Sequence, residues 1–220
     1  MSFSWRSFLH VAAILTAALF GAAPSHAGVV ITYTDYASWA AAVSGVTTVT
    51  IPQPVDLNLG YDFFGAGTAS VTYSGVVFSS SSTLGDGYLF NIGTVFSEVP
   101  PVLSSQETSF GVENILISLP WDVTGFALNY GTFNAGRVTF QLSNGDSVTQ
   151  GSTGSGYSVP DFLGVTDSTS FNWVLVTSSD PVLNLNDVSY NGVPEPAVWL
   201  LLAGGLAGLL VHGRRRAKSA

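Results

Sequence analysis

The 220-residue chain contains no cysteine, and its long central segment, residues 28–192, also contains no histidine and no lysine. The three histidines, His10, His26 and His212, all lie outside that segment. A Ser-His-Asp triad, a cysteine nucleophile, a Schiff-base lysine and a zinc site with His or Cys ligands are therefore excluded there. Without disulfides the segment must fold around an apolar core, and about 165 residues are enough for one domain of that kind.

Positive charge is almost as scarce. Of the six basic residues only Arg137 lies within residues 28–192, whereas all 14 acidic residues except Glu195 lie there. The segment therefore carries a formal charge of about −12. Such a charge repels phosphate backbones and anionic lipids, which argues against a nucleic-acid partner.

Residues 1–27 have the pattern of a secretory signal peptide. Arg6 supplies a positive charge, residues 11–23 form an apolar run, and Ser25-His26-Ala27 is a small-x-small cleavage pattern. We expect signal peptidase to cut between Ala27 and Gly28 after the secretion machinery has engaged the chain. Residues 28–192 would then form an exported domain.

Residues 193–220 combine three features. Pro194-Glu195-Pro196 favours an extended backbone, because proline fixes its own φ and restricts the residue before it. The apolar run 197–213 predicts a transmembrane helix about 26 Å long, slightly short for a membrane span. Arg214-Arg215-Arg216 follows, and the positive-inside rule places this basic end in the cytoplasm.

The order of these features resembles the PEP-CTERM sorting signal of exopolysaccharide-producing Gram-negative bacteria. Pro194, Glu195 and Pro196 match its tripeptide, and Arg214, Arg215 and Arg216 match its basic end. The resemblance implies recognition by an exosortase, a membrane-embedded cysteine peptidase or transpeptidase that cuts near the tripeptide. It also implies that the inner membrane holds the protein briefly, with the body in the periplasm, before release to the cell surface or the extracellular matrix of a biofilm. The alternative is an ordinary C-terminal membrane anchor.

Residues 28–192 show β-rich runs separated by turn residues. Val138, Phe140 and Leu142 alternate with polar residues, and Asn144-Gly145 supplies a hairpin turn. One short helix is predicted over 36–43, capped by Asp35. We predict an all-β, antiparallel sandwich of jelly-roll or lectin-like form with Trp39, Trp121, Phe126 and Trp173 inside. The predicted strands cover residues 29–33, 47–51, 69–78, 88–96, 114–119, 123–130, 137–142, 147–150, 171–177 and 183–190.

Three short stretches resemble β-rich extracellular domains that often carry this sorting signal. Residues 33–43 are similar to their first strand and helix, residues 161–165 to a late loop, and residues 185–190 to the closing strand. The resemblance implies a sandwich but no particular ligand.

Aromatic residues beside glycine-rich stretches are the first candidate site. Exposed rings of this kind stack on sugars, and small polar neighbours add hydrogen bonds. The alternative is that these rings simply fill the core of the sandwich. The candidates are Tyr61, Phe63, Phe64, Tyr88, Phe90, Tyr130, Phe133 and Tyr157.

Acidic and amide side chains are the other candidates. Calcium needs six to eight oxygen ligands. The candidate ligands are Asn184, Asn186 and Asp187 in one place, Asn144 and Asp146 in another, and Asp86 in a third. The alternative is that these residues belong to ordinary turns. Paired carboxylates are the minimum for glycoside hydrolysis, but no motif pairs any two of Glu98, Glu107, Glu113, Asp122 and Asp161. Arg137 could pair with a carboxylate in the core or at a strand edge.

The favoured hypothesis is a non-enzymatic envelope or extracellular-matrix protein, without a cofactor, that an exosortase sorts and processes. The alternative is a lectin-like module that binds exopolysaccharide, and a glycoside hydrolase is a remote third.

Overall fold

A computed structural model describes residues 28–55, 60–66, 68–81, 88–93, 101–106 and 113–192; the side chains of Ala66, Thr68, Ser81 and Glu113 are not described. The signal peptide, the Pro-Glu-Pro motif and the predicted transmembrane helix lie outside these residues. No helix among the described residues has the length and apolarity to span a membrane.

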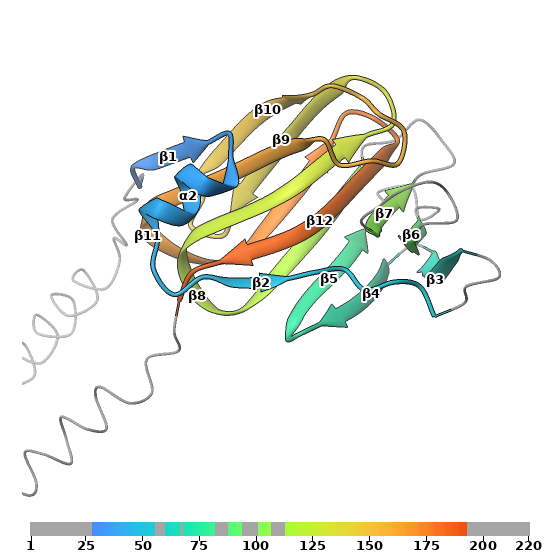
Figure 1. Ribbon diagram of the computed structural model, residues 1–220, viewed down its shortest axis with the longest axis horizontal. Helices are drawn as coiled ribbons and strands as arrows, with labels where there is room; N and C mark the ends of the chain where they lie inside the picture. Colours follow the sequence, from blue (N-terminus) through green and yellow to red (C-terminus); the bar gives the residue numbers. More distant parts are fainter. Residues whose placement is uncertain are drawn as a thin grey trace, which may run out of the picture.

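The described residues form antiparallel strands and one short helix, so the predicted all-β class is confirmed (Figure 1). The jelly-roll or lectin-like form remains a prediction. The helix is α2 (Tyr36–Ala42), and Asp35 caps it as predicted, because the Asp35 Oδ1 accepts a hydrogen bond of 2.8 Å from the Ser38 N–H. This contact also holds the pKa of the Asp35 carboxyl below its usual value. The strands are β1 (Val30–Tyr33), β2 (Thr47–Val49), β3 (Tyr61–Ala66), β4 (Thr68–Tyr73), β5 (Val76–Ser81), β6 (Tyr88–Ile92), β7 (Val102–Gln106), β8 (Glu113–Thr132), β9 (Gly136–Leu142), β10 (Ser147–Ser152), β11 (Asp161–Ser178) and β12 (Val182–Tyr190).

Two long strands, β8 and β11, pair with each other along most of their length and pass through both layers of a sandwich. Their outer neighbours change halfway. The first layer has the order β10-β9-β11-β8-β5-β4 and uses the first half of β8 and the second half of β11. The second layer has the order β1-β11-β8-β12-β7-β6-β3 and uses their other halves, with β2 beside the end of β12. Figure 1 shows α2 and β1 at one end of the molecule and β3, β6 and β7 at the other.

The change of layer reverses which side chains face the core. Ile115 and Ile117 are buried in the first half of β8, whereas Phe126 and Leu128 are buried in the second half. In β11 the pairing with β8 is irregular between Thr166 and Trp173, and the buried positions shift from odd-numbered to even-numbered residues there.

One apolar core joins the two layers. The Tyr130 ring of β8 lies edge-on to Phe140 of β9, with 5.2 Å between ring centroids. The Ser105 hydroxyl of β7 donates to the Ser80 hydroxyl of β5, at 3.3 Å. Buried side chains of both layers belong to one hydrophobic cluster, which replaces disulfides as the source of stability.

Several details of the predicted strands are wrong. The strand predicted over 69–78 is a hairpin of β4 and β5, because Ser74 and Gly75 both adopt positive φ (49° and 85°) and reverse the chain. Residues 161–165 form the start of β11 and not a loop. β3 and β7 were not predicted.

The burial predicted for two of the tryptophans is also wrong. Trp39 and Phe126 are fully buried as predicted, but Trp121 is only partly buried against the core. Trp173 is half-buried, because the irregularity in β11 turns Val174 inward in its place.

Candidate functional site

Four aromatic rings cluster on the outer face of the second layer, at the edge formed by β3 and β6. Phe90 of β6 lies 5.8 Å from Tyr61, 5.4 Å from Phe63 and 5.9 Å from Tyr88, measured between ring centroids. Phe63 and Tyr88 are 5.7 Å apart. Leu89 alternates with these rings and enters the core, so the cluster faces away from the core. We call Tyr61, Phe63, Tyr88 and Phe90 the aromatic cluster.

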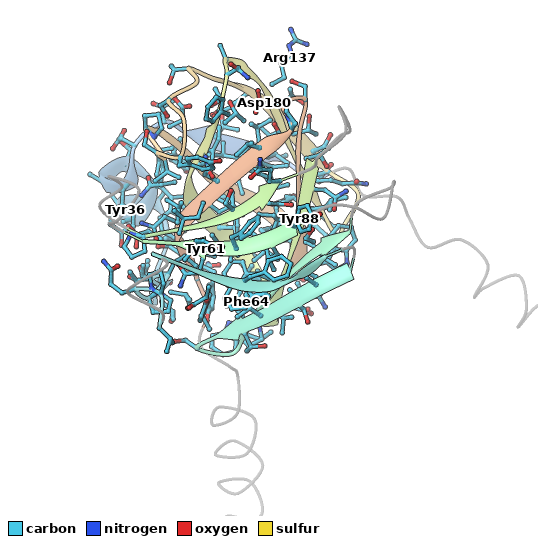
Figure 2. The ribbon with its side chains drawn as sticks, turned by 90° about the vertical axis from the view of Figure 1, so that its right-hand side faces the viewer. Tyr36, Tyr61, Phe64, Tyr88, Arg137 and Asp180 are labelled. Atoms are coloured by element: carbon cyan, nitrogen blue, oxygen red, sulfur yellow. The ribbon has the colours of Figure 1, made fainter. Side chains whose placement is uncertain are left out.

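The cluster is accessible. The Phe63 side chain is 53% exposed, and the other three rings are partly exposed. Figure 2 shows Tyr61 and Tyr88 on neighbouring strands near the centre of that view. The four rings contact one another and therefore form one contiguous aromatic patch on this face.

A cleft of about 150 Å³ borders the cluster. It is lined by Tyr61, Phe90, Ile92, Gln106 of β7 and Tyr157. Tyr157 comes from the segment 153–160 and contacts Phe133 edge-on at 5.7 Å. The cleft therefore combines the rings of Tyr61 and Phe90, from the sheet, with the ring of Tyr157, from the segment 153–160. The Gln106 amide adds a group that can donate and accept hydrogen bonds.

The segment that carries Tyr157 is held against β8 and β12. The Asn184 Nδ2 donates to the Gly156 carbonyl at 2.9 Å, and the Ser155 N–H donates to the Thr132 carbonyl at 3.1 Å. Gly131 allows this approach, because a Cβ at that position would collide with the Ser158 carbonyl. The Asn184 side chain and the backbone of β8 therefore hold the segment that carries Tyr157.

Asp180 fixes the neighbouring turn. Its carboxylate is almost fully buried and accepts hydrogen bonds from the Phe133 N–H (3.2 Å), the Asn134 N–H (3.1 Å), the Asn134 Nδ2 (3.0 Å) and the Val182 N–H (3.0 Å). These bonds tie the β8–β9 turn to the β11–β12 turn and thereby hold Phe133 beside Tyr157.

Two predicted stacking residues do not belong to this face. Tyr130 is only 1% exposed, because the second half of β8 turns it into the core, where its hydroxyl donates to the Gly151 carbonyl at 2.9 Å. Burial, and then the nearby Asp161 charge, raise the pKa of Tyr130 to about 12. Phe64 packs against the core, because it alternates with Phe63 along β3. Neither side chain therefore lies on the face of the aromatic cluster, which corrects the sequence prediction for these two residues.

The predicted calcium residues make other contacts. The Asn186 Oδ1 accepts a 2.7 Å hydrogen bond from the Asp187 N–H, and Asn184 holds the segment 153–160. The Asn144 Nδ2 donates to Asp167, and its Oδ1 accepts from the Asp146 N–H, as in an ordinary turn. The described residues contain no group of three or more His, Cys, Asp or Glu side chains that could hold a metal. Asp86 lies outside them, and calcium binding stays a prediction.

The charged candidates are dispersed. Glu98 and Glu107 lie outside the described residues, and the Glu113 side chain is not described. Asp122 is exposed, whereas Asp161 accepts hydrogen bonds from the Ser152 hydroxyl (2.8 Å) and the Thr153 N–H (3.1 Å). Arg137 points away from the body and forms no ion pair with any described residue, contrary to the predicted pairing (Figure 2).

Sequence reasoning found the four cluster residues and Tyr157 but missed Gln106 and Ile92. Gln106 belongs to β7, which was not predicted because its sequence, Val-Leu-Ser-Ser-Gln, is short and rich in serine. Ile92 was within a predicted strand, and only the register with Tyr61 places it beside the cleft.

No family model matches the chain, and no curated protein matches it. Among solved structures, a variant of a family 29 carbohydrate-binding module matches with a TM-score of 0.31 and 12% identity, over 67% of this chain and 92% of that chain. A second variant of the module, in complex with mannohexaose, matches with a TM-score of 0.29 and 11% identity, over 66% and 89%. At these TM-scores neither a shared fold nor a shared ligand follows, so the function must be argued from this chain's own side chains.

Proposed function

We propose that the domain 28–192 is a non-catalytic module that binds a neutral polysaccharide through the aromatic cluster and the adjoining Tyr157 cleft. The observation that carries the proposal is the convergence of four partly exposed rings on one sheet face, beside a cleft with an amide. Aromatic faces supply contact area for sugar rings, and a few placed polar groups fix their orientation.

The charge of the domain favours a neutral ligand. Arg137 is the only basic residue in 28–192, and it points away from the body, so no cation is available near the cleft to pair with a uronate or sulfate group. A formal charge of about −12 also repels polyanions over the length of a Debye screening distance.

Replacing Phe63 with Ala tests the proposal. Phe63 is half-exposed, so its removal should leave stability nearly unchanged while weakening binding by about fivefold, the equivalent of about 1 kcal/mol for one aromatic contact. Affinity electrophoresis in gels that contain glucomannan, galactomannan, dextran or alginate measures the change. Ile31→Ala is the control, because Ile31 is 51% exposed on β1, outside the cluster. Binding to no neutral polysaccharide, or equal retardation of both variants, would refute the assignment.

We further propose that the C-terminal signal delivers this module to the cell surface or matrix through an exosortase. The order Pro-Glu-Pro, apolar run and arginines supports this. The other terminus is consistent with export: the Gly28 nitrogen lies 2.9 Å from the Asp146 Oδ2, so cleavage after Ala27 would create an ammonium group beside a carboxylate.

Glu195→Ala should block C-terminal processing and leave the protein in the membrane fraction. The intact mass of the protein from cells and from medium reports both cleavage sites at once. Release of the Glu195→Ala variant with the mass of the parent would contradict the sorting proposal and leave the binding proposal unaffected.

A further inference from the structure

A second hollow, of about 300 Å³, lies on the same outer face beyond β7. It is lined by Tyr36 of α2, Thr48 of β2, Asn129 of β8, Phe162 of β11, and Asp187 and Ser189 of β12. Asn129 alternates with the core residues Leu128 and Tyr130 along β8, and Phe90 alternates with the core residue Leu89 along β6. Both hollows therefore open on the side of the second layer that faces away from the core. Three inter-strand spacings, about 14 Å, separate β6 from β8.

The hollow has an aromatic wall. Tyr36 is 48% exposed and lies edge-on to Phe162, with 6.3 Å between ring centroids. Trp39, fully buried beneath α2, contacts Tyr36 at 5.8 Å and donates from Nε1 to the Val165 carbonyl at 3.1 Å. The Tyr36 ring is therefore presented by a helix that is pinned to the sheet. α2, which carries Tyr36, lies at the end of the molecule away from β3 and β6 (Figure 1), and Figure 2 shows Tyr36 offset from Tyr61 and Tyr88.

Asp187 reaches the hollow through a strained backbone. Its φ is 46°, a left-handed value that side-chain-bearing residues seldom adopt, and it lies where the pairing of β12 with β8 shifts register between Asn186 and Ser189. A bulge of this kind re-aims a side chain out of the regular strand pattern. Strain at one residue commonly persists where it serves a function.

The polar groups of the hollow retain bonding capacity. The Asp187 carboxylate has one contact among the described residues, a 3.5 Å approach from the Asn186 Nδ2, and the Asn129 amide has none. Thr48 and Ser189 bond to each other through their hydroxyls at 2.8 Å. A carboxylate and an amide beside an exposed ring can bind the vicinal hydroxyls and the apolar face of one sugar residue.

We propose that this hollow is a second saccharide subsite, in which Tyr36 stacks on a sugar ring and Asp187 accepts hydrogen bonds from its hydroxyls. The inference extends the proposed polysaccharide binding but rests on different residues. Its ligand class is a neutral sugar with two adjacent free hydroxyls, since a uronate or sulfate would meet the Asp187 charge.

The test is affinity electrophoresis of the whole protein in glucomannan, galactomannan and dextran gels, with variants of Tyr36 and Asp187. Asp187→Asn keeps the shape and tolerance of positive φ but removes the charge, and should weaken binding by about tenfold. Tyr36→Ala should weaken it by about fivefold, and Tyr36→Phe should restore it, because stacking needs the ring and not the hydroxyl.

Asp187→Gly separates function from structure. Glycine relieves the left-handed backbone, so the unfolding midpoint should rise by about 2 °C while binding falls. Ser74→Gly is the matched control, because Ser74 also has positive φ (49°) but lies in the β4–β5 turn: its midpoint should rise with no change in binding. A lower midpoint for Asp187→Gly, or unchanged binding in the Tyr36 and Asp187 variants, would overturn the inference.

The variants also separate the two proposals. Loss of binding with Phe63→Ala alone would leave the aromatic cluster as the site and reject the second subsite. Loss of binding with Tyr36→Ala and Asp187→Asn, but not with Phe63→Ala, would keep the second subsite and reject the aromatic cluster as the site. Unchanged binding in all three variants would reject both proposals.

Discussion

Gly164 of β11 makes it possible for α2 to lie on the sheet, and a single methyl group tests that arrangement. A Cβ at this position would lie 2.7 Å from the Trp39 Cγ and Cδ1 atoms and 2.8 Å from its Cβ. Trp39 is fully buried and bonded to the Val165 carbonyl. It would have to retreat by about 0.7 Å to reach an ordinary contact distance of 3.4 Å, and that movement would lengthen its hydrogen bond.

The expected cost follows from these contacts. Overpacking of a buried site costs about 1–3 kcal/mol, and the reduced freedom of the unfolded chain in a Gly→Ala change returns about 0.4–1 kcal/mol. We therefore expect Gly164→Ala to lower the free energy of unfolding by about 1–2 kcal/mol and the midpoint of thermal unfolding by about 2–8 °C.

Denaturant unfolding followed by tryptophan fluorescence measures this loss. The control is Gly151→Ala in β10, where an added Cβ meets nothing within 4 Å, so stability should be unchanged or slightly higher. Equal unfolding midpoints for the two variants would show that Trp39 does not pack against Gly164, and the docking of α2 would be wrong.

Two further predictions concern buried polar groups. Asp180→Asn should lower the free energy of unfolding by about 2–3 kcal/mol, because the amide cannot accept all four hydrogen bonds of the carboxylate. The control, Asp122→Asn at an exposed site, should cost nothing measurable. Similar denaturation curves for the two variants would show that the Asp180 hydrogen bonds do not hold the two turns together. Stability should also fall as pH rises from 10 to 12. Burial first, and then the charges of Asp62 and Asp161, raise the pKa values of Tyr73 and Tyr130 to about 12, so unfolded tyrosines ionise near pH 10 while these two keep their protons. Urea midpoints between pH 8 and 12 should show a shallower alkaline decline in Tyr130→Phe, and an identical decline would argue against the raised pKa.

Elements with an uninterrupted local pattern were predictable from the sequence. Apolar and polar residues alternate strictly in β9, its turn into β10 carries Asn144-Gly145, and Asp35 caps α2. In these elements the tertiary contacts favour the same structure as the local sequence. The continuity of β8 and β11 was not predictable. The prediction gave two strands, 114–119 and 123–130, whereas β8 continues through Pro120 and passes from one layer to the other there.

The candidate site was predictable in composition but not in arrangement. The sequence identifies aromatic residues near glycines, but strand register decides which of them share a face. Phe63 and Phe64 are adjacent in sequence and lie on opposite sides of β3. The sequence named Asp187 only as a possible calcium ligand. The aromatic wall beside it was not predictable, because Tyr36 and Phe162 are brought together only by the contact between α2 and β11.

The passage of β8 and β11 through both layers makes the domain one cooperative unit. Neither layer has a complete set of its own strands, so opening one layer would break the β8–β11 ladder that also supports the other. Unfolding should therefore occur in a single transition, with the slowest amide hydrogen exchange along that ladder. A destabilising substitution in the first layer, such as Phe78→Ala at a fully buried position, would then lower the fraction of molecules with a folded aromatic cluster. A substitution of equal cost next to the cluster would lower that fraction by the same amount.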